Sequence, residues 1–284
     1  MMKQLLVPTD FSHCASNAVD FAVQSAKLLP VEVLLLHTYE LSGNLYTDYM
    51  GVNKEFKESM VRDAYEKLMK CKADIMKHEG VDVKAVFYRG TLKDGIDETV
   101  ANEKTDLIVM GTTGASGLDE KIWGSKTAGI IGHSKIPVLA IPKGYNWKRP
   151  ERVLIATNHF EKDPAMLDFV FEMAGQYKAG VHTIVFSDTD DDLPEKMINH
   201  GNQISVYEKL LKTKYPELSL HSENLFGIEF EESIEKYASE NDMDMLVMFT
   251  YHRSYWDRIF HPSITKRMSY HTHIPLLAIP ADRK

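Results

Sequence analysis

The stretch SKIPVLAIPKG, Ser134–Gly144, recurs near the end of the chain as THIPLLAIPAD, Thr272–Asp282. A second pair, TDLIVMGTT (Thr105–Thr113) and MDMLVMFTY (Met243–Tyr251), has the same offset of 138 residues. The openings KQLLVPTDF and ERVLIATNHF also correspond to each other. An internal repeat of this length indicates that the chain contains two copies of one structural unit.

We therefore predict two domains, 1–146 and 147–284, with a short linker within PKGYNWKRPER, which is rich in glycine, proline and charge. In the first copy, the apolar runs KQLLVP, EVLLLHT, DVKAVFY, DLIVM and PVLAIP are typical of buried strands. Helical spacing separates them; it is clearest in a long amphipathic helix from about Glu55 to Lys77 and in a first helix that Ser16 can cap. The predicted fold class is α/β: two tandem doubly wound domains, each with a five-stranded parallel sheet flanked by helices.

The composition narrows the class of protein. The chain has 284 residues and a net charge of −8, with no basic cluster, which argues against a nucleic-acid partner. Cys14 and Cys71 lie far apart and lack the spacing of a disulfide framework or a zinc site. We see neither a signal peptide nor a run of 18 apolar residues, so we expect a cytoplasmic protein without membrane association.

The glycine-rich stretch GTTGASGLDEKIWGSKT, Gly111–Thr127, directly follows the predicted strand DLIVM. Ligands of doubly wound sheets bind at such carboxyl ends, where the strand order reverses. Backbone N–H groups among glycines and at the N-terminus of the next helix suit a phosphate, although a plain glycine-rich loop is the alternative. The spacing matches neither the Walker A loop nor the dinucleotide fingerprint.

This chain resembles the universal stress protein family. The family spacing is glycine, two residues, glycine, nine residues, then glycine and serine or threonine, and Gly111, Gly114, Gly124 and Ser125 stand at those positions. The opening VPTDFS, the ending PVLAIP and His37 at the close of the second strand add to the resemblance, which covers the whole chain as two tandem copies.

The resemblance implies that the first copy binds ATP, with or without Mg²⁺. Asp10 is then a partner for polar groups of the ribose or adenine, and its alternative role is to cap the helix that follows. Thr113 departs from the basic residue or histidine often found at its place, and Lys126 could offset that loss. The residues that carry over from the family are Pro8, Thr9 and Asp10 at the adenosine, Thr38 at the base, Met110, Gly111, Thr113 and Gly114 at the start of the loop, and Gly124, Ser125 and Lys126 at the β- and γ-phosphates.

The second copy lacks this chemistry. Its aligned residues are Phe249, His252, Pro262 and Ser263, so bulky or rigid side chains replace three glycines. We therefore expect nucleotide binding in the first copy alone. The aromatic and histidine residues around YHRSYWDRIFHPS could form a plug, hold a different apolar ligand or, with His271 and His273, bind a metal.

We find no catalytic constellation and name no catalytic residue or metal ligand. The leading hypothesis is an ATP-binding stress-response sensor or adaptor, read by a protein partner that the sequence does not identify. The alternatives are a weak ATPase with slow turnover, or a tandem protein whose second copy binds another small ligand. Family members often dimerise through the last strand, so we expect PVLAIP to pair with PLLAIP inside one chain as a pseudo-dimer, with homodimerisation of whole chains left open.

Overall fold

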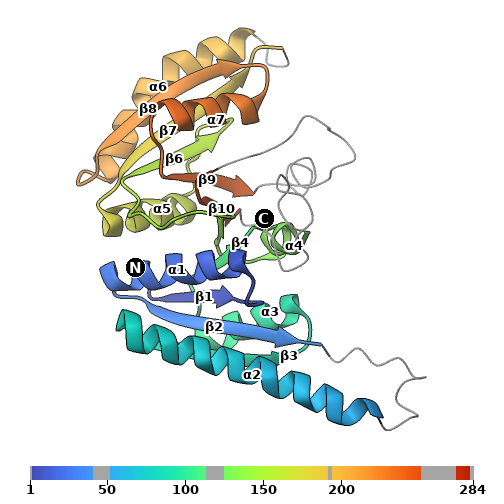
Figure 1. Cartoon of the computed structure of the whole chain (residues 1–284). Coiled ribbons are helices and arrows are strands. Elements are labelled where there is room, and N and C mark those ends of the chain that lie inside the picture. The colour runs from blue at the N-terminus through green and yellow to red at the C-terminus, as the bar shows by residue number, and fades with distance from the viewer. Residues whose placement is uncertain (1, 41–51, 113–124, 191–193, 251–272, 282–284) are drawn as a thin grey trace.

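The computed structural model describes residues 2–40, 52–112, 125–190, 194–250 and 273–281. Within this part of the chain, strands and helices alternate, and all the strands join one sheet (Figure 1). The sheet has ten strands in the order β3-β2-β1-β4-β5-β10-β9-β6-β7-β8. The strands are β1 (Gln4–Pro8), β2 (Glu32–Tyr39), β3 (Val83–Arg89), β4 (Leu107–Gly111), β5 (Val138–Ile141), β6 (Arg152–Thr157), β7 (Gly180–Asp188), β8 (Leu220–Gly227), β9 (Met245–Thr250) and β10 (Leu276–Pro280).

Helices cover both faces of the sheet, as a doubly wound fold requires. The buried residues of α1, α2, α5 and α6 belong to one apolar cluster, and those of α3, α4 and α7 belong to the other. The described helices are α1 (His13–Leu28), α2 (Val52–Glu79), α3 (Leu92–Glu103), α4 (Ser125–His133), α5 (Pro164–Tyr177), α6 (Pro194–Lys214) and α7 (Phe230–Glu240).

Side chains alternate between the two clusters along each strand. In β1, Leu5 and Val7 pack in the cluster with α1 and α2, and Leu6 packs in the cluster with α3 and α4. Successive residues of a strand point to opposite faces, so a strand covered on both sides must be apolar throughout. This is why β1 reads as an unbroken apolar run in the sequence.

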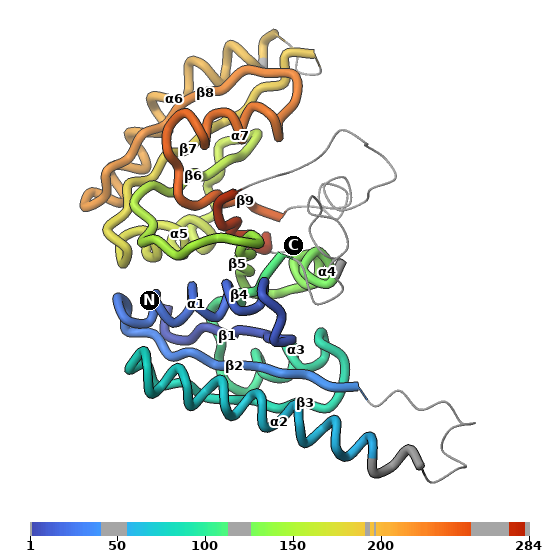
Figure 2. Tube along the Cα trace, viewed as in Figure 1, coloured from blue at the N-terminus to red at the C-terminus, as the bar shows by residue number. Residues whose placement is uncertain are grey.

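The two halves of the molecule join at the centre of the sheet. Strand β5 pairs with β10 antiparallel, whereas the other strand pairs are parallel. The predicted pairing of PVLAIP with PLLAIP is confirmed, and it hides two sheet edges that would otherwise expose unpaired backbone groups. Figure 2 shows α1 and α5 facing each other across this junction, where the Tyr177 hydroxyl donates to Ser25 Oγ at 2.8 Å.

The predicted strands of the first half are confirmed, with small differences at the helix ends. The long helix α2 extends beyond the predicted Glu55–Lys77 at both ends, to Val52–Glu79. The prediction that Ser16 caps the first helix is wrong, because Ser12 is the N-cap and accepts from the Ala15 N–H. Ser16 lies inside the helix, where its hydroxyl donates to the Ser12 carbonyl at 3.1 Å.

Candidate functional site

The candidate site of the first half lies where the strand order reverses. Strand β1 has β2 on one side and β4 on the other, and all three run parallel. The segments that leave β1 and β4 therefore start side by side at the carboxyl edge of the sheet. Pro8 ends β1 and Gly111 ends β4, so the two sequence motifs singled out above meet here.

The turn after β1 is fixed by its own side chains. Thr9 is buried, and its hydroxyl accepts from the Phe11 N–H at 3.1 Å. The Asp10 carboxylate accepts from the Ser12 N–H at 3.0 Å. Phe11 has a φ of 61°, in the left-handed region that a bulky residue rarely adopts. Asp10 thus shapes the turn and does not cap the helix, which is the role of Ser12.

An aromatic wall stands beside this turn. The ring of His37 stacks on Phe11 with 4.5 Å between centroids, and Phe87 follows at 5.8 Å from His37. His37 Nδ1 lies 2.7 Å from the Thr9 carbonyl oxygen, which can only accept, so Nδ1 carries the proton. Thr38 follows His37 in β2, and its side chain lies against Gly95 of α3 on the opposite face of the sheet.

The end of β4 packs tightly against the start of α1. Met110 is buried in the cluster that includes α4. A Cβ on Gly111 would lie 2.6 Å from the carbonyl oxygen of Cys14 and 2.8 Å from its Sγ. The Cys14 thiol is buried and lies 3.9 Å from both the Thr112 hydroxyl and the Ile141 carbonyl. Gly111 is therefore required by helix–strand packing, apart from any role toward a ligand.

The first turn of α4 is tied to the end of β4. The buried Thr127 hydroxyl donates to the Gly111 carbonyl at 2.7 Å. The chain thus leaves β4 and returns to the same point, which sets the N-terminus of α4 at the carboxyl edge of the sheet. Ser125 begins α4 and the Lys126 side chain is exposed. Three predicted site residues lie outside the described residues: Thr113, Gly114 and Gly124.

The corresponding place in the second half is built differently. Phe249 stands at the position of Gly111, one residue before the end of β9, and its side chain is buried. Strands β1 and β6 align with an offset of 148, which matches His13 to Glu161, yet α5 begins only at Pro164. The second half therefore lacks, at this place, the first helical turn that in α1 holds Cys14 beside Gly111. The remaining predicted counterparts, His252, Pro262 and Ser263, lie outside the described residues, as do the plug and most of the histidines proposed for a metal.

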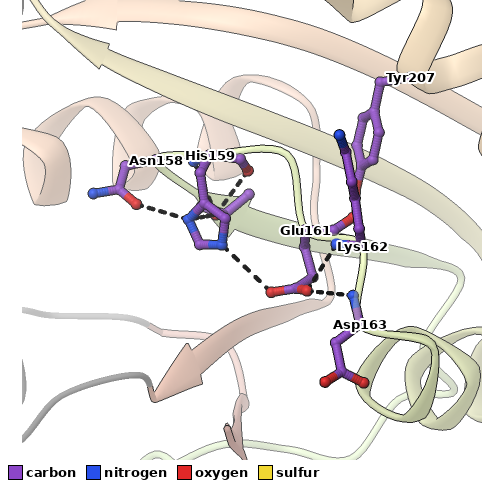
Figure 3. A network of polar contacts seen from close by, with 7 residues as sticks. Asn158, His159, Glu161, Lys162, Asp163 and Tyr207 are labelled. Carbon is purple, nitrogen blue, oxygen red and sulfur yellow. Dashed lines mark hydrogen bonds and ion pairs between the residues drawn. The ribbon is translucent and has the colours of Figure 1, made fainter.

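A polar network occupies the turn after β6 (Figure 3). The Glu161 carboxylate is buried and accepts from the N–H groups of Lys162 at 2.7 Å and Asp163 at 2.6 Å. Its other oxygen lies 3.4 Å from His159 Nε2, and His159 Nδ1 lies 3.0 Å from the Asn158 side-chain oxygen. Asn158, at the position of Asp10, is thus held by its neighbour.

Burial alone would raise the pKa of Glu161. The interaction with His159 and the N–H groups of Lys162 and Asp163 outweigh burial, so the pKa lies below its ordinary value. Glu161 is therefore a carboxylate at neutral pH, stabilised by donors from its own turn. This network is a structural element of the second half, and it fixes the turn that follows β6.

Two contacts were not predicted from the sequence, one at the candidate site and one at the corresponding place in the second half. The Thr127 hydroxyl bond was not foreseen, although a threonine in the first turn of a helix after a glycine loop is a usable signal. The Glu161 network was also missed, because nothing in NHFEK shows that the glutamate turns inward. Among the residues that the structure describes, no three His, Cys, Asp or Glu side chains gather as metal ligands. No helix within the same residues is long and apolar enough to cross a membrane.

Comparison with known proteins matches the chain twice to one family. The model of the universal stress protein family matches residues 1–142 and 150–280. A universal stress protein of Methanocaldococcus jannaschii is 29% identical over 143 residues, which cover 50% of this chain and 84% of that protein. A second protein of the same organism is 29% identical over 157 residues and is covered to 96%.

The solved structures agree on the architecture. The crystal structure of a universal stress protein from Archaeoglobus fulgidus has a TM-score of 0.72, with 98% of each chain covered and 18% identity. This likeness shows the tandem fold over the full length. A universal stress protein crystallised in complex with cAMP matches 50% of this chain at 23% identity and a TM-score of 0.35.

Proposed function

The chain belongs to the universal stress protein family, and on that premise we propose that it is an ATP-binding sensor or adaptor of the stress response. ATP binds in the first half only, at the carboxyl edge of β1 and β4. A partner protein then distinguishes the ATP-bound chain from the free chain.

The observation that carries this proposal is the bond from Thr127 to the Gly111 carbonyl. It sets the N-terminus of α4 next to the turn that holds Asp10. A helix N-terminus presents unpaired N–H groups and a partial positive charge, both of which favour phosphate. The adenosine then lies toward β1 and β2, and the triphosphate lies toward α4.

The residues of the turn after β1 fit a nucleoside. Asp10 uses one carboxylate oxygen for the Ser12 N–H, and a carboxylate has about four lone-pair sites, so it can also accept from a ribose hydroxyl. Pro8 and Thr9 form the floor of the turn, and the backbone of Thr38 lies at the end of the neighbouring strand for the base. Lys126 is exposed and within the first turn of α4, where its charge favours the distal phosphates.

The proposed site roles rest in part on the family spacing. Met110 and Gly111 lead into the loop, Thr113 and Gly114 face the ribose and the first phosphates, and Gly124 and Ser125 complete the cradle. When bound with ATP, Mg²⁺ would neutralise phosphate charge. We propose nucleotide binding without efficient hydrolysis, because the sequence offers Asp10 alone as a candidate base or metal ligand at this place.

The second half is proposed to bind no ATP. Phe249 places a buried ring near the end of β9, where Gly111 of the first half has no side chain. This ring removes space that the proposed site needs. The turn after β6 also differs from its counterpart, because Glu161 accepts from the N–H groups of Lys162 and Asp163.

Isothermal titration of the full chain with ATP and Mg²⁺ tests this proposal. We expect one site per chain. Asp10→Asn, which keeps an acceptor for Ser12, should weaken binding about tenfold because charge-assisted hydrogen bonds are about twice as strong as neutral ones. The matched control, Asn158→Ala in the second half, should leave the affinity unchanged. Absence of heat with the wild-type chain, or equal loss in both variants, would contradict the proposal.

A further inference from the structure

A groove lies between α5 and α6 in the second half, and none of the residues proposed for the nucleotide site line it. It has a volume of about 660 Å³ and is lined almost entirely by apolar atoms. Leu167 of α5 is buried at its floor, and Pro164 stands beside it. Val206 and Leu210 of α6 form its wall and are exposed by 68% and 49%.

The apolar residues of α6 form a stripe on one face of the helix. Val206, Leu210 and Thr213 follow the i, i+4, i+7 spacing that brings side chains onto one side. The stripe is about 10 Å long at 1.5 Å per residue, which corresponds to two turns of a second helix. This spacing and the concave shape between two helices suit an amphipathic helix laid into the groove.

Lysines surround the groove, although the chain as a whole carries a net charge of −8. Lys162, Lys209 and Lys214 line it. Lys214 is paired with Asp168 at 2.7 Å, whereas among the described residues neither Lys162 nor Lys209 has an ion pair. The nearest glutamate on α6, Glu208, is paired with Lys212. Asp163, the exposed N-cap of α5, stands between Lys162 and Pro164 in the sequence but does not line the groove, so the charged residues that do line it are all lysines.

The equivalent groove in the first half is lined by acidic residues where the second half has lysines. It lies between α1 and α2, and Ser16 and Val19 stand where the second half has Pro164 and Leu167. Its volume is about 240 Å³, and its charged residues are Asp20 and Glu79. Of these two grooves, the one in the second half is the larger and the basic one, so its size and charge do not follow from the shared fold.

We propose that the α5–α6 groove is the docking site for an acidic amphipathic helix of a partner protein. The apolar side of that helix covers Val206 and Leu210, and its carboxylates face Lys162, Lys209 and Lys214. A second copy of this chain is a poor occupant in a symmetric arrangement, because two such grooves would bring lysines against lysines. The groove would be the surface through which an adaptor contacts its partner protein, and in that respect this inference rests on the proposed function.

The test is a fluorescence-anisotropy titration of the full chain, without ATP, against a labelled helical peptide. The peptide has leucine at i, i+3, i+4 and i+7 and glutamate at the remaining positions, and a scrambled peptide of the same composition is the control. We expect saturable binding of the patterned peptide alone, weakened at high salt because surface charges are screened. No binding, or equal binding of the scrambled peptide, would overturn the proposal.

Two variants test whether the peptide binds in the α5–α6 groove. Val206→Glu should weaken binding of the peptide by about tenfold or more, as expected for a central contact of such an interface. Ile198→Glu is the matched control: it is a 63% exposed apolar residue of the same helix that does not line the groove, so affinity should not change. Equal loss in both variants would contradict the assignment.

Two further outcomes would replace the proposed occupant. If sedimentation showed self-association that Val206→Glu abolishes, a second copy would be the occupant. If vesicles with anionic lipid bound the chain and Val206→Glu abolished that binding, the face would be a membrane contact. Because these measurements involve no nucleotide, a failure of ATP binding and a failure of this proposal give different results.

Discussion

Leu139 of β5 lies directly opposite Leu277 of β10 in the central antiparallel pair, and the two leucines are equivalent positions of the repeat. Their neighbours obey the same rule: Val138 pairs with Ala278, and Ala140 pairs with Leu276. A local two-fold axis therefore passes between the two leucines. One chain thereby forms the edge-to-edge contact that two separate copies would otherwise need.

This relationship predicts equal and coupled roles for the two leucines. Leu139→Ala and Leu277→Ala should each lower the free energy of unfolding by about 2–5 kcal/mol, since both side chains are fully buried. The double variant should cost less than the sum, with a coupling of about 0.5–3 kcal/mol, because opposed residues share one cavity. Urea unfolding of the wild-type chain, the two single variants and the double variant gives the double-mutant cycle that measures this coupling.

The control for that cycle is Leu34→Ala, a buried leucine of β2 in the other apolar cluster. Combined with Leu139→Ala, it should be additive within about 0.5 kcal/mol. Additivity of Leu139→Ala with Leu277→Ala would contradict direct packing across the junction.

Gly111 is predicted to be needed for packing even without a ligand. Gly111→Ala places a Cβ 2.6 Å from the Cys14 carbonyl oxygen, a backbone atom that cannot turn away. We expect a loss of about 1–3 kcal/mol in the free energy of unfolding, measured without ATP. Gly129→Ala in α4 has nothing within 4 Å of the new Cβ and should stabilise by about 0.5–1 kcal/mol. Similar values for the two variants would show that the close approach has no energetic consequence.

The Thr127 hydroxyl is predicted to position the start of α4. Thr127→Val keeps the shape but leaves the Gly111 carbonyl without this donor, which should cost about 1–3 kcal/mol of stability and weaken ATP binding. Thr99→Val also removes a buried hydroxyl bond, to the Gly95 carbonyl in α3, and should leave ATP affinity unchanged. Titration calorimetry on both variants separates the two effects, and an unchanged ATP affinity in Thr127→Val would count against the tie to the site.

The Glu161 network predicts a specific dependence on pH. Since the pKa of Glu161 in the folded chain lies below its ordinary 4.5, its stabilisation is present above that pH and is lost as the pH falls through the folded pKa. Glu161→Gln should therefore cost about 1–3 kcal/mol at neutral pH, and the difference from wild type should shrink in acid.

Asp168→Asn is the comparison for that measurement. Asp168 also has a lowered pKa, caused by hydrogen bonds from Lys214 and Tyr215, but its side chain is 46% exposed. An exposed pair contributes at most about 1 kcal/mol, so this variant should have a small effect. A Glu161→Gln cost that stays constant from neutral pH into acid would show that the charge does not matter.

Much of the fold follows from the sequence because the pattern is strong at each level. Apolar runs such as DLIVM have one interpretation when helical patterns flank them, and the repeat of PVLAIP as PLLAIP identifies the two strands that meet. Local details were less accessible: the sequence analysis placed the cap of the first helix at Ser16, whereas the structure places it at Ser12, four residues earlier.

The location of the candidate site could be predicted from the sequence, but the contacts within it could not. Doubly wound topology brings the ends of β1 and β4 together wherever the sequence has them, so the meeting of Asp10 and Gly111 could be expected. The proximity of Gly111 to Cys14 depends on how closely α1 approaches the sheet, and the inward turn of Glu161 depends on burial. The spacing of residues along the sequence encodes neither this proximity nor the inward turn of the glutamate.

Native mass spectrometry of the full chain with ATP tests the central claim most directly. We expect one bound nucleotide per chain, which disappears when Gly124 is replaced by a bulky residue and persists when Phe249 is replaced by Ala. Two nucleotides per chain, none, or one that survives the change at Gly124 would contradict an ATP site confined to the first half.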